Sequence, residues 1–278
     1  MLCLRGLSLQ FPDAAEPLFQ DVSFDVQPGE IVSLLARTGG GKSSLLACIT
    51  GEQELSQGRV LLDGRDLTLL APWRRTDYVA LVSQRRGVGI PGHMRVREVL
   101  WVFGSGRRCS FAFMRRSEAD RVARDLLEPL LPQLCGRLGS QVNTLSAGEF
   151  QVLSLACAMA SLRRRPEGRT GVLLLDEHVA HLDSQTASFV MQLTQDNIRR
   201  ERLAAVFVTH DLHLATSVSD RMVVLRDGRL VYDGVPVDVE QALQLVYGPN
   251  TAELPPESPL RPAAIDTRNL SPYESPQP

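Results

Sequence analysis

Nine consecutive residues have the composition of a phosphate-binding loop: Ala36-Arg37-Thr38-Gly39-Gly40-Gly41-Lys42-Ser43-Ser44. They match the pattern G-x-x-x-x-G-K-[ST], except that alanine takes the first position. Glycines let backbone N–H groups surround a phosphate, and a following helix presents its positive end to the same charge. Lys42 would add a compact ammonium, and the Ser43 hydroxyl can bind Mg²⁺. The alternative is a glycine-rich turn that carries a lysine by chance.

Lys42 is the only lysine in the chain, because the other twenty-nine of its thirty basic residues are arginine. Genomic base composition accounts for a general excess of arginine. It does not account for the exception, and a forked guanidinium cannot replace an ammonium in a phosphate cradle. The exception therefore favours a phosphate site over a chance turn.

Two carboxylates, Asp176 and Glu177, follow the apolar run Val172 to Leu175. At the end of a buried strand beside a phosphate loop, Asp176 would hold Mg²⁺ through water, and Glu177 would act as general base toward an attacking water. Two solvated acids after a strand are the alternative for an isolated dipeptide. The order of the pair relative to Lys42 favours the catalytic interpretation.

Leu145-Ser146-Ala147-Gly148-Glu149 precedes an apolar helix predicted over Phe150 to Leu162. Taken alone, this is a helix start at which Ser146 caps the first turn.

Short apolar runs and turn residues predict the strands that must position these groups. Ile31 to Leu35 leads into the glycine loop, and the helix Ser43 to Thr50 follows, closed by Gly51. Further strands are predicted at Gly58 to Leu62, Tyr78 to Val82, Val172 to Leu175, Ala204 to Val208, Met222 to Leu225 and Arg229 to Tyr232, with tight turns at Asp63-Gly64 and Asp227-Gly228. The alternation of strand and helix predicts an α/β fold with a mostly parallel sheet.

A helical insertion is predicted from about residue 85 to 161, including a helix over Glu118 to Leu131 that Ser117 caps. After Gly248 the chain holds eight of its seventeen prolines and few large apolar residues. We therefore predict one nucleotide-binding domain over 1–248 and a disordered tail over 249–278.

Composition limits the classes of function. The chain has 278 residues, is 44% hydrophobic and carries a formal net charge of −2, so no general attraction to nucleic acid is expected. Its apolar runs fall short of the ~18 residues of a spanning helix, and its start lacks the pattern of a signal peptide. The five scattered cysteines fit a reducing compartment as ordinary small apolar residues. A cytosolic location is expected.

The motifs together resemble those of the ATP-binding cassette (ABC) ATPases over about residues 1 to 235. The family's order is a phosphate loop, then Gln84 after a strand, Leu145 to Glu149, Asp176-Glu177, Asp183, and His210 after a strand. The resemblance implies a P-loop NTPase core with an N-terminal antiparallel β subdomain and a helical insertion. It also implies hydrolysis of ATP with Mg²⁺.

The resemblance implies roles for individual positions. Ser146, Ala147 and Gly148 correspond to the signature motif that binds the γ-phosphate of ATP held by the partner subunit. Gln84 corresponds to the residue that touches Mg²⁺ and the lytic water and links the site to a membrane partner. The remaining correspondences are Asp183 where the two subunits meet, His210 on the γ-phosphate and Phe11 stacked on adenine. For Phe11, a core phenylalanine is the alternative.

The sequence departs from the family pattern in three places. Ala36 and Ala147 replace glycines, and an added methyl forbids either position only if its φ must be positive. The stretch from His178 to His181 replaces the usual Pro-Thr-Ser-Ala. We interpret His178 and His181 as loop residues and not as metal ligands.

The leading hypothesis is the ATPase subunit of an ABC transporter, bound to the inner face of the cell membrane. Its partners would be a second copy or a homologous ATPase subunit, a separate transmembrane permease and, for an importer, an extracytoplasmic solute-binding protein. Asp176-Glu177-His178 and the stretch from Gly87 to Val99 are similar to subunits of tryptophan/tyrosine-type importers. The alternatives are a non-transport ABC ATPase and a nucleotide-dependent regulator that does not hydrolyse ATP.

Overall fold

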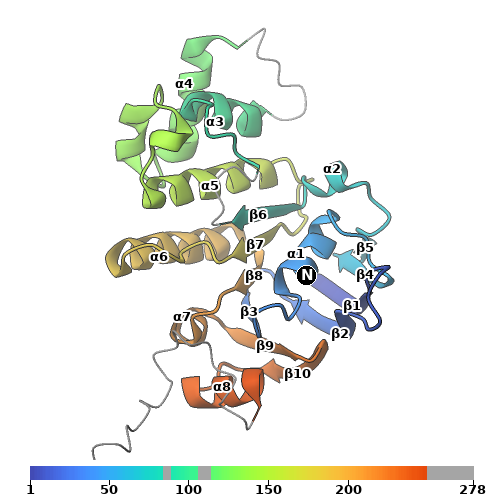
Figure 1. The fold of residues 1–278 in the computed structure, drawn as a ribbon. Coiled ribbons are helices and arrows are strands. Elements are labelled where there is room, and N and C mark those ends of the chain that lie inside the picture. Colours follow the sequence, from blue (N-terminus) through green and yellow to red (C-terminus); the bar gives the residue numbers. More distant parts are fainter. Residues whose placement is uncertain (84–88, 106–113, 249–278) are drawn as a thin grey trace, which may run out of the picture.

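The computed structural model describes residues 1–83, 89–105 and 114–248 (Figure 1). The predicted tail over 249–278 and the predicted site residue Gln84 lie outside these residues. The described part contains two sheets and a helical region that lies against the edge of the larger sheet.

The larger sheet has six strands in the order β10-β9-β3-β8-β7-β6. Its strands are β3 (Ile31–Ala36), β6 (Val79–Ser83), β7 (Val172–Asp176), β8 (Ala204–Val208), β9 (Arg221–Arg226) and β10 (Arg229–Gly234). The five strands from β9 to β6 are parallel, and β10 returns antiparallel to β9 through the predicted Asp227-Gly228 turn. β3 and β8 are buried throughout, as expected for central parallel strands covered on both faces.

The smaller sheet is antiparallel and has the order β2-β1-β4-β5. Its strands are β1 (Leu2–Leu9), β2 (Phe19–Val26), β4 (Gln57–Leu62) and β5 (Arg65–Asp66). Asp63 and Gly64 form the tight turn between β4 and β5, both with positive φ, 49° and 79°. This sheet confirms the predicted N-terminal antiparallel subdomain.

The side chains of the parallel sheet belong to two buried clusters, one on each face, because successive residues of a strand point to opposite faces. Leu173, Leu175 and Phe207 pack with the helical region, whereas Leu174 and Val206 pack with the smaller sheet. Helix α1 (Lys42–Thr50) belongs to the second cluster. The helix after the glycine loop is therefore held between the two sheets.

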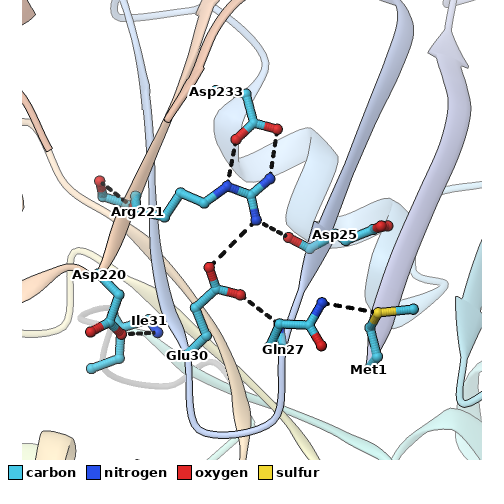
Figure 2. Close-up of polar contacts among 9 residues, drawn as sticks. Met1, Asp25, Gln27, Glu30, Ile31, Asp220, Arg221 and Asp233 are labelled. Atoms are coloured by element: carbon cyan, nitrogen blue, oxygen red, sulfur yellow. Dashed lines mark hydrogen bonds and ion pairs between the residues drawn. The ribbon is translucent and has the colours of Figure 1, made fainter. Parts of the chain in front are cut away.

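Arg221 joins the two sheets at the start of β9 (Figure 2). Its guanidinium donates to both carboxylate oxygens of Asp233, at 2.6 and 2.7 Å, and to the carbonyl of Asp25 on β2 at 2.9 Å. Glu30 accepts from the same guanidinium at 3.4 Å. The network lies where the parallel strands begin, at the edge opposite the glycine loop.

The helices outside the insertion are α1, α2 (Pro72–Arg75), α6 (Ser184–Glu201), α7 (Leu212–Val218) and α8 (Val239–Tyr247). The helical region contains α3 (Val96–Ser105), α4 (Arg116–Leu127), α5 (Ala147–Leu162) and the 3₁₀ turns η3 (Pro132–Arg137) and η4 (Val142–Thr144). Within the described ranges no helix is both long enough and apolar enough to span a bilayer.

The prediction for α4 was wrong at both ends. The helix begins at Arg116 after an extended Arg115, so Ser117 lies inside it and caps nothing. It ends at Leu127, and the backbone of Leu131 (φ −152°, ψ 85°) is not helical because Pro132 follows it. The predicted apolar face is correct: Leu126, Leu127 and Leu130 are buried in the larger cluster and Val122 packs against it.

Candidate functional site

The glycine loop connects the end of β3 to the start of α1. Gly39 and Gly41 have φ of 77° and 85°, a left-handed conformation that residues with a Cβ rarely adopt. A Cβ on Gly40 would lie 2.9 Å from the Ala36 methyl and 2.9 Å from the Arg37 carbonyl oxygen. Ala36 itself is the last residue of the strand and has no positive φ, so alanine is unstrained there. The loop geometry therefore needs its glycines and tolerates the departure at position 36.

Lys42 folds back over this loop. Its Nζ donates to the Ala36 carbonyl at 2.7 Å and to the Arg37 carbonyl at 3.1 Å. Burial lowers the pKa of the ammonium, while the charges of Glu177 and Asp176 oppose that shift. The two carboxylates predicted to act beside Lys42 thus lie within electrostatic reach of it.

The strand register explains why these groups meet. β8 lies between β3 and β7, and Val208 pairs with Leu34 on one side and with Asp176 on the other. Asp176 is also opposite Ser83, the last residue of β6. Parallel strands end at one edge, so the segments that follow β3, β7 and β8 emerge together.

Glu177 and His210 contact each other at that edge. His210 Nδ1 lies 3.2 Å from Glu177 Oε1, and the Glu177 N–H donates to the Val208 carbonyl at 2.9 Å. Glu177 has a φ of +50°. The side chains are 36% and 63% exposed for Glu177 and His210, so both are open to a ligand from solvent.

The oxygen donors fit a magnesium ion. Ser43, in the first turn of α1, is exposed, and Asp176 and Glu177 are half-buried. Mg²⁺ is commonly held by one or two carboxylates together with substrate phosphates and water. The described part of the chain contains no group of three or more histidine, cysteine, aspartate or glutamate side chains that could hold a metal ion.

The predicted signature residues lie elsewhere on the chain. Ser146 caps α5, since its hydroxyl accepts from Glu149 N–H at 3.2 Å and Glu149 accepts from Ser146 N–H at 2.8 Å. A Cβ on Gly148 would lie 2.5 Å from Thr186 Cγ2 in the first turn of α6. Asp183 caps the same helix through the Thr186 N–H at 3.0 Å. Ser146 to Gly148 and Asp183 therefore form a second group, built on the starts of α5 and α6.

Two further residues predicted to contact nucleotide are Ala147, at the start of α5, and Phe11, after β1. Ala147 is the first residue of α5 and has no positive φ, so the alanine is unstrained. Phe11 follows β1 and is 41% exposed, which disfavours the alternative of a core phenylalanine. Both stay predictions as nucleotide contacts.

Two buried polar residues that contact or adjoin elements of the site were not predicted from the sequence. Arg75 is only 8% exposed and donates to the carbonyls of Cys48 (3.0 Å) and Ile49 (3.4 Å) at the end of α1. His178, expected in an ordinary loop, is 1% exposed, and burial lowers its pKa to about 3. Arg75 was one of many arginines in the sequence, and no local pattern distinguished His178 from an exposed loop residue.

This arrangement of a glycine loop, a helix start, strand-end carboxylates and a histidine on a parallel sheet defines a P-loop nucleotide-binding protein. The family model described as ABC transporter matches residues 19–180. The chain therefore belongs to the ABC transporter family, and it is an ATPase cassette of that family.

Relatives and a solved structure agree with this assignment. A "Tyrosine transport ATP-binding protein" of Clostridioides difficile is 36% identical over 237 residues, which cover 84% of this chain and 91% of that protein. A "Hemin import ATP-binding protein HmuV" of Bordetella avium is 30% identical over 258 residues, 91% of this chain and 95% of the relative. The dimeric post-hydrolysis structure of the ATP-binding cassette MJ0796 with ADP and Pi has a TM-score of 0.69 at 23% identity, covering 86% of this chain and 100% of that one. That likeness concerns the fold and confirms the predicted fold class.

Proposed function

We propose that this chain is the subunit that binds and hydrolyses ATP to power solute import through a separate membrane permease. The contact between Glu177 and His210 at 3.2 Å, within reach of the charge of Lys42, is the observation that carries the proposal. Relatives named for methionine import and for hemin import support transport in the inward direction.

ATP would bind with its phosphates on the loop from Ala36 to Ser44. Lys42 would exchange its two carbonyl contacts for phosphate oxygens, and the loop N–H groups and the start of α1 would stabilise the same charge. Ser43 and Asp176 would hold Mg²⁺, which supplies charge stabilisation on the transferred phosphoryl group. Phe11 would lie against adenine.

Glu177 would accept a proton from water as the water oxygen attacks the γ-phosphorus and the bond to the bridging oxygen of ADP breaks. His210 would orient the Glu177 carboxylate and contact the γ-phosphate. Gln84 would position the same water and Mg²⁺. Hydrolysis needs all of these groups around the same γ-phosphate, so the proposal requires them to meet at the edge where the parallel strands end.

The second group of residues would act on the ATP of a partner subunit. Gly148 lies against Thr186 in the first turn of α6, which places Ser146 and Ala147 beside the start of that helix. A second copy or a homologous subunit would bring this group against the γ-phosphate, with Asp183 at the junction. Each catalytic centre would then be shared between two chains.

A cavity of about 350 Å³ beside the edge strand β6 is suited to the permease. Its lining comes from the end of α2, from β6, from α3 and from around the end of α5, and includes Thr76, Val79, Leu81, Val102, Phe103 and Arg164. An apolar loop or short helix of the permease would bind there and place the chain on the inner face of the membrane. An extracytoplasmic solute-binding protein would deliver the cargo.

The cargo would be chosen by the permease and the binding protein, since the relatives of this cassette are named for tyrosine, methionine and hemin. The tyrosine relative and the similarity to tryptophan/tyrosine-type subunits favour an aromatic amino acid.

Purification of the tagged chain from detergent-solubilised membranes tests the proposal. We expect a protein with several spanning helices to co-purify, and Mg²⁺-dependent phosphate release from ATP by the complex. Recovery with ribosomes or DNA and no membrane protein would favour a non-transport ATPase. ATP binding without phosphate release would favour a regulator.

A further inference from the structure

His178 directly follows Glu177 and is the only buried polar side chain in the segment from 177 to 183. The neighbouring Glu177 and His181 both have left-handed backbone, with φ of 50° and 64°. Such backbone is unfavourable for residues with a Cβ and persists only where the surroundings hold it. The loop that carries Glu177 therefore needs an anchor.

The His178 ring lies between β8 and α6. Its centroid is 5.7 Å from that of Phe207, and the two rings meet edge to face at 83°. Its Nε2 lies 3.5 Å from the Thr194 hydroxyl oxygen. The ring thus joins the loop of Glu177 to a strand and to a helix.

The Thr194 contact favours one tautomer of the ring. Thr194 donates its own hydrogen to the Val190 carbonyl at 2.8 Å, so toward His178 its oxygen is available as an acceptor. The tautomer with the proton on Nε2 and the lone pair on Nδ1 is the one that pairs with this acceptor across the separation of 3.5 Å. Nδ1 is buried and has no hydrogen-bond partner among the residues that the structure describes.

The elements on either side of the ring carry the rest of the site. Phe207 precedes Val208, whose carbonyl accepts from Glu177 N–H, and lies three residues before His210. Thr194 lies on α6, the helix that Asp183 caps. A displacement of the ring would therefore change how Glu177 meets His210.

We infer that His178 is a positioning residue for hydrolysis: its Nε2–H, held by Thr194, fixes the backbone of Glu177 so that the carboxylate faces His210 and the attacking water. The role rests on the proposed function of Glu177 as general base. His178 exchanges no proton in the reaction and touches no nucleotide.

Four variants of the full chain test this role. His178→Phe keeps the ring against Phe207 and removes the donor, and Thr194→Val removes the acceptor. Thr194→Ser keeps the acceptor and is the matched control. The fourth variant combines His178→Phe with Thr194→Val, so that no buried donor is left without a partner.

We expect kcat for ATP to fall about tenfold in His178→Phe and in Thr194→Val, with KM for ATP changed less than about twofold, because misplacement affects the chemical step. Thr194→Ser should keep kcat within about twofold of wild type. The double variant should be no slower than His178→Phe alone, because both changes break one contact. Circular dichroism and Tm establish that each variant is folded.

A second readout does not depend on activity. Long-range ¹H–¹⁵N spectra of the histidine-labelled chain should show His178 with Nε2 protonated and Nδ1 bare at neutral pH, and Thr194→Val should shift Nε2 selectively. The opposite tautomer would overturn the inference.

Unchanged kcat in His178→Phe and Thr194→Val, with only Tm lowered, would reduce His178 to a packing residue. That result differs from failure of the proposed function, in which the wild-type protein would bind ATP without hydrolysing it and the role of His178 would fall with that of Glu177.

Discussion

Lys42 offers a chemical test at the scale of one residue. It is the only lysine in the chain, so an amine-selective acylating reagent has one side-chain target besides the α-amino group. Its Nζ donates to two backbone carbonyls of the loop, and the side chain is partly exposed. A bound triphosphate would cover this ammonium.

We therefore predict that saturating Mg²⁺ and ATP slow the acylation of Lys42 at least about tenfold, measured by mass spectrometry of the intact and digested protein. The α-amino group of Met1 serves as internal control, because it binds Asp63 and Thr170 away from the loop. Equal protection of both amines, or of neither, would contradict the placement of the phosphates.

Glu149, in the first turn of α5, makes the stability of this helix start depend on pH. Burial raises the pKa of its carboxyl. Hydrogen bonds from the Ser146 N–H and from the Arg137 guanidinium, 2.7 Å away, lower the pKa by more, so the net pKa lies below the ordinary value. A carboxyl whose pKa is lower in the folded state than in the unfolded chain stabilises the fold at pH values above the unfolded pKa of about 4.3. This stabilisation is lost as the pH falls through the pKa of the folded state.

We predict that Glu149→Gln is less stable than wild type at pH 7 and that the difference shrinks as pH falls below about 4.3. Urea unfolding at pH 7, 5 and 4 measures it. A difference that stays constant or grows toward low pH would show that the carboxylate charge has no part in stabilising the helix start.

At the scale of elements, Arg75 holds the end of the helix that begins with Lys42. Its buried guanidinium satisfies the carbonyls of Cys48 and Ile49, where α1 has no further N–H groups to accept from. It also donates to Leu70 at 3.1 Å and Thr68 at 3.2 Å. The negative end of the α1 dipole therefore faces a fixed cation.

Arg75→Met should lower the free energy of unfolding by about 2–4 kcal/mol, because four carbonyl groups lose a buried donor. Arg74→Met is the matched control, since Arg74 is exposed and stacks on Trp73, with its guanidinium carbon 4.9 Å from the ring centroid. The control should cost less than about 1 kcal/mol. Similar costs for both variants in urea unfolding would contradict the assigned role.

The starts of α5 and α6 approach so closely that Gly148 admits no side chain. Gly148→Ala would place a methyl 2.5 Å from Thr186 Cγ2, forcing the two helix starts apart. We predict at least about a tenfold loss of ATPase activity, because Ser146 and Asp183 would move with these helix starts.

Thr186→Ser removes the opposing methyl and leaves the nearest side-chain atom, Cβ, at 4.0 Å. The double variant should therefore regain most of the lost activity, while Thr186→Ser alone should stay close to wild type. Failure of the second change to restore phosphate release would show that something other than Thr186 excludes the methyl group.

At the scale of the whole molecule, the sequence predicted the strands that end in functional residues but not the order of the strands. Lys42, Asp176 and His210 each follow a recognisable apolar strand, so their shared edge followed once a parallel sheet was assumed. The position of β8 between β3 and β7 depends on long-range packing that local patterns do not contain.

Buried polar residues were the least predictable part of the site. Nothing in the run Trp73-Arg74-Arg75 distinguishes the exposed arginine from the buried one, and only the fold turns Arg75 toward α1. The burial of His178 likewise depends on residues that are distant in sequence, Phe207 and Thr194. Pro132 accounts for the non-helical backbone of Leu131, whereas the end of α4 four residues earlier, at Leu127, was not predicted.

Phosphate release from ATP by the Glu177→Gln variant tests the central claim most directly. Glutamine keeps the size of the side chain and a contact to His210 but cannot accept the proton of water, so we predict a fall of about 10²-fold or more with ATP still bound between two chains. Glu167→Gln, at an exposed loop position, is the control and should release phosphate at the wild-type rate. Normal phosphate release by the Glu177→Gln variant would contradict the assignment of Glu177 as general base and the mechanism built on it.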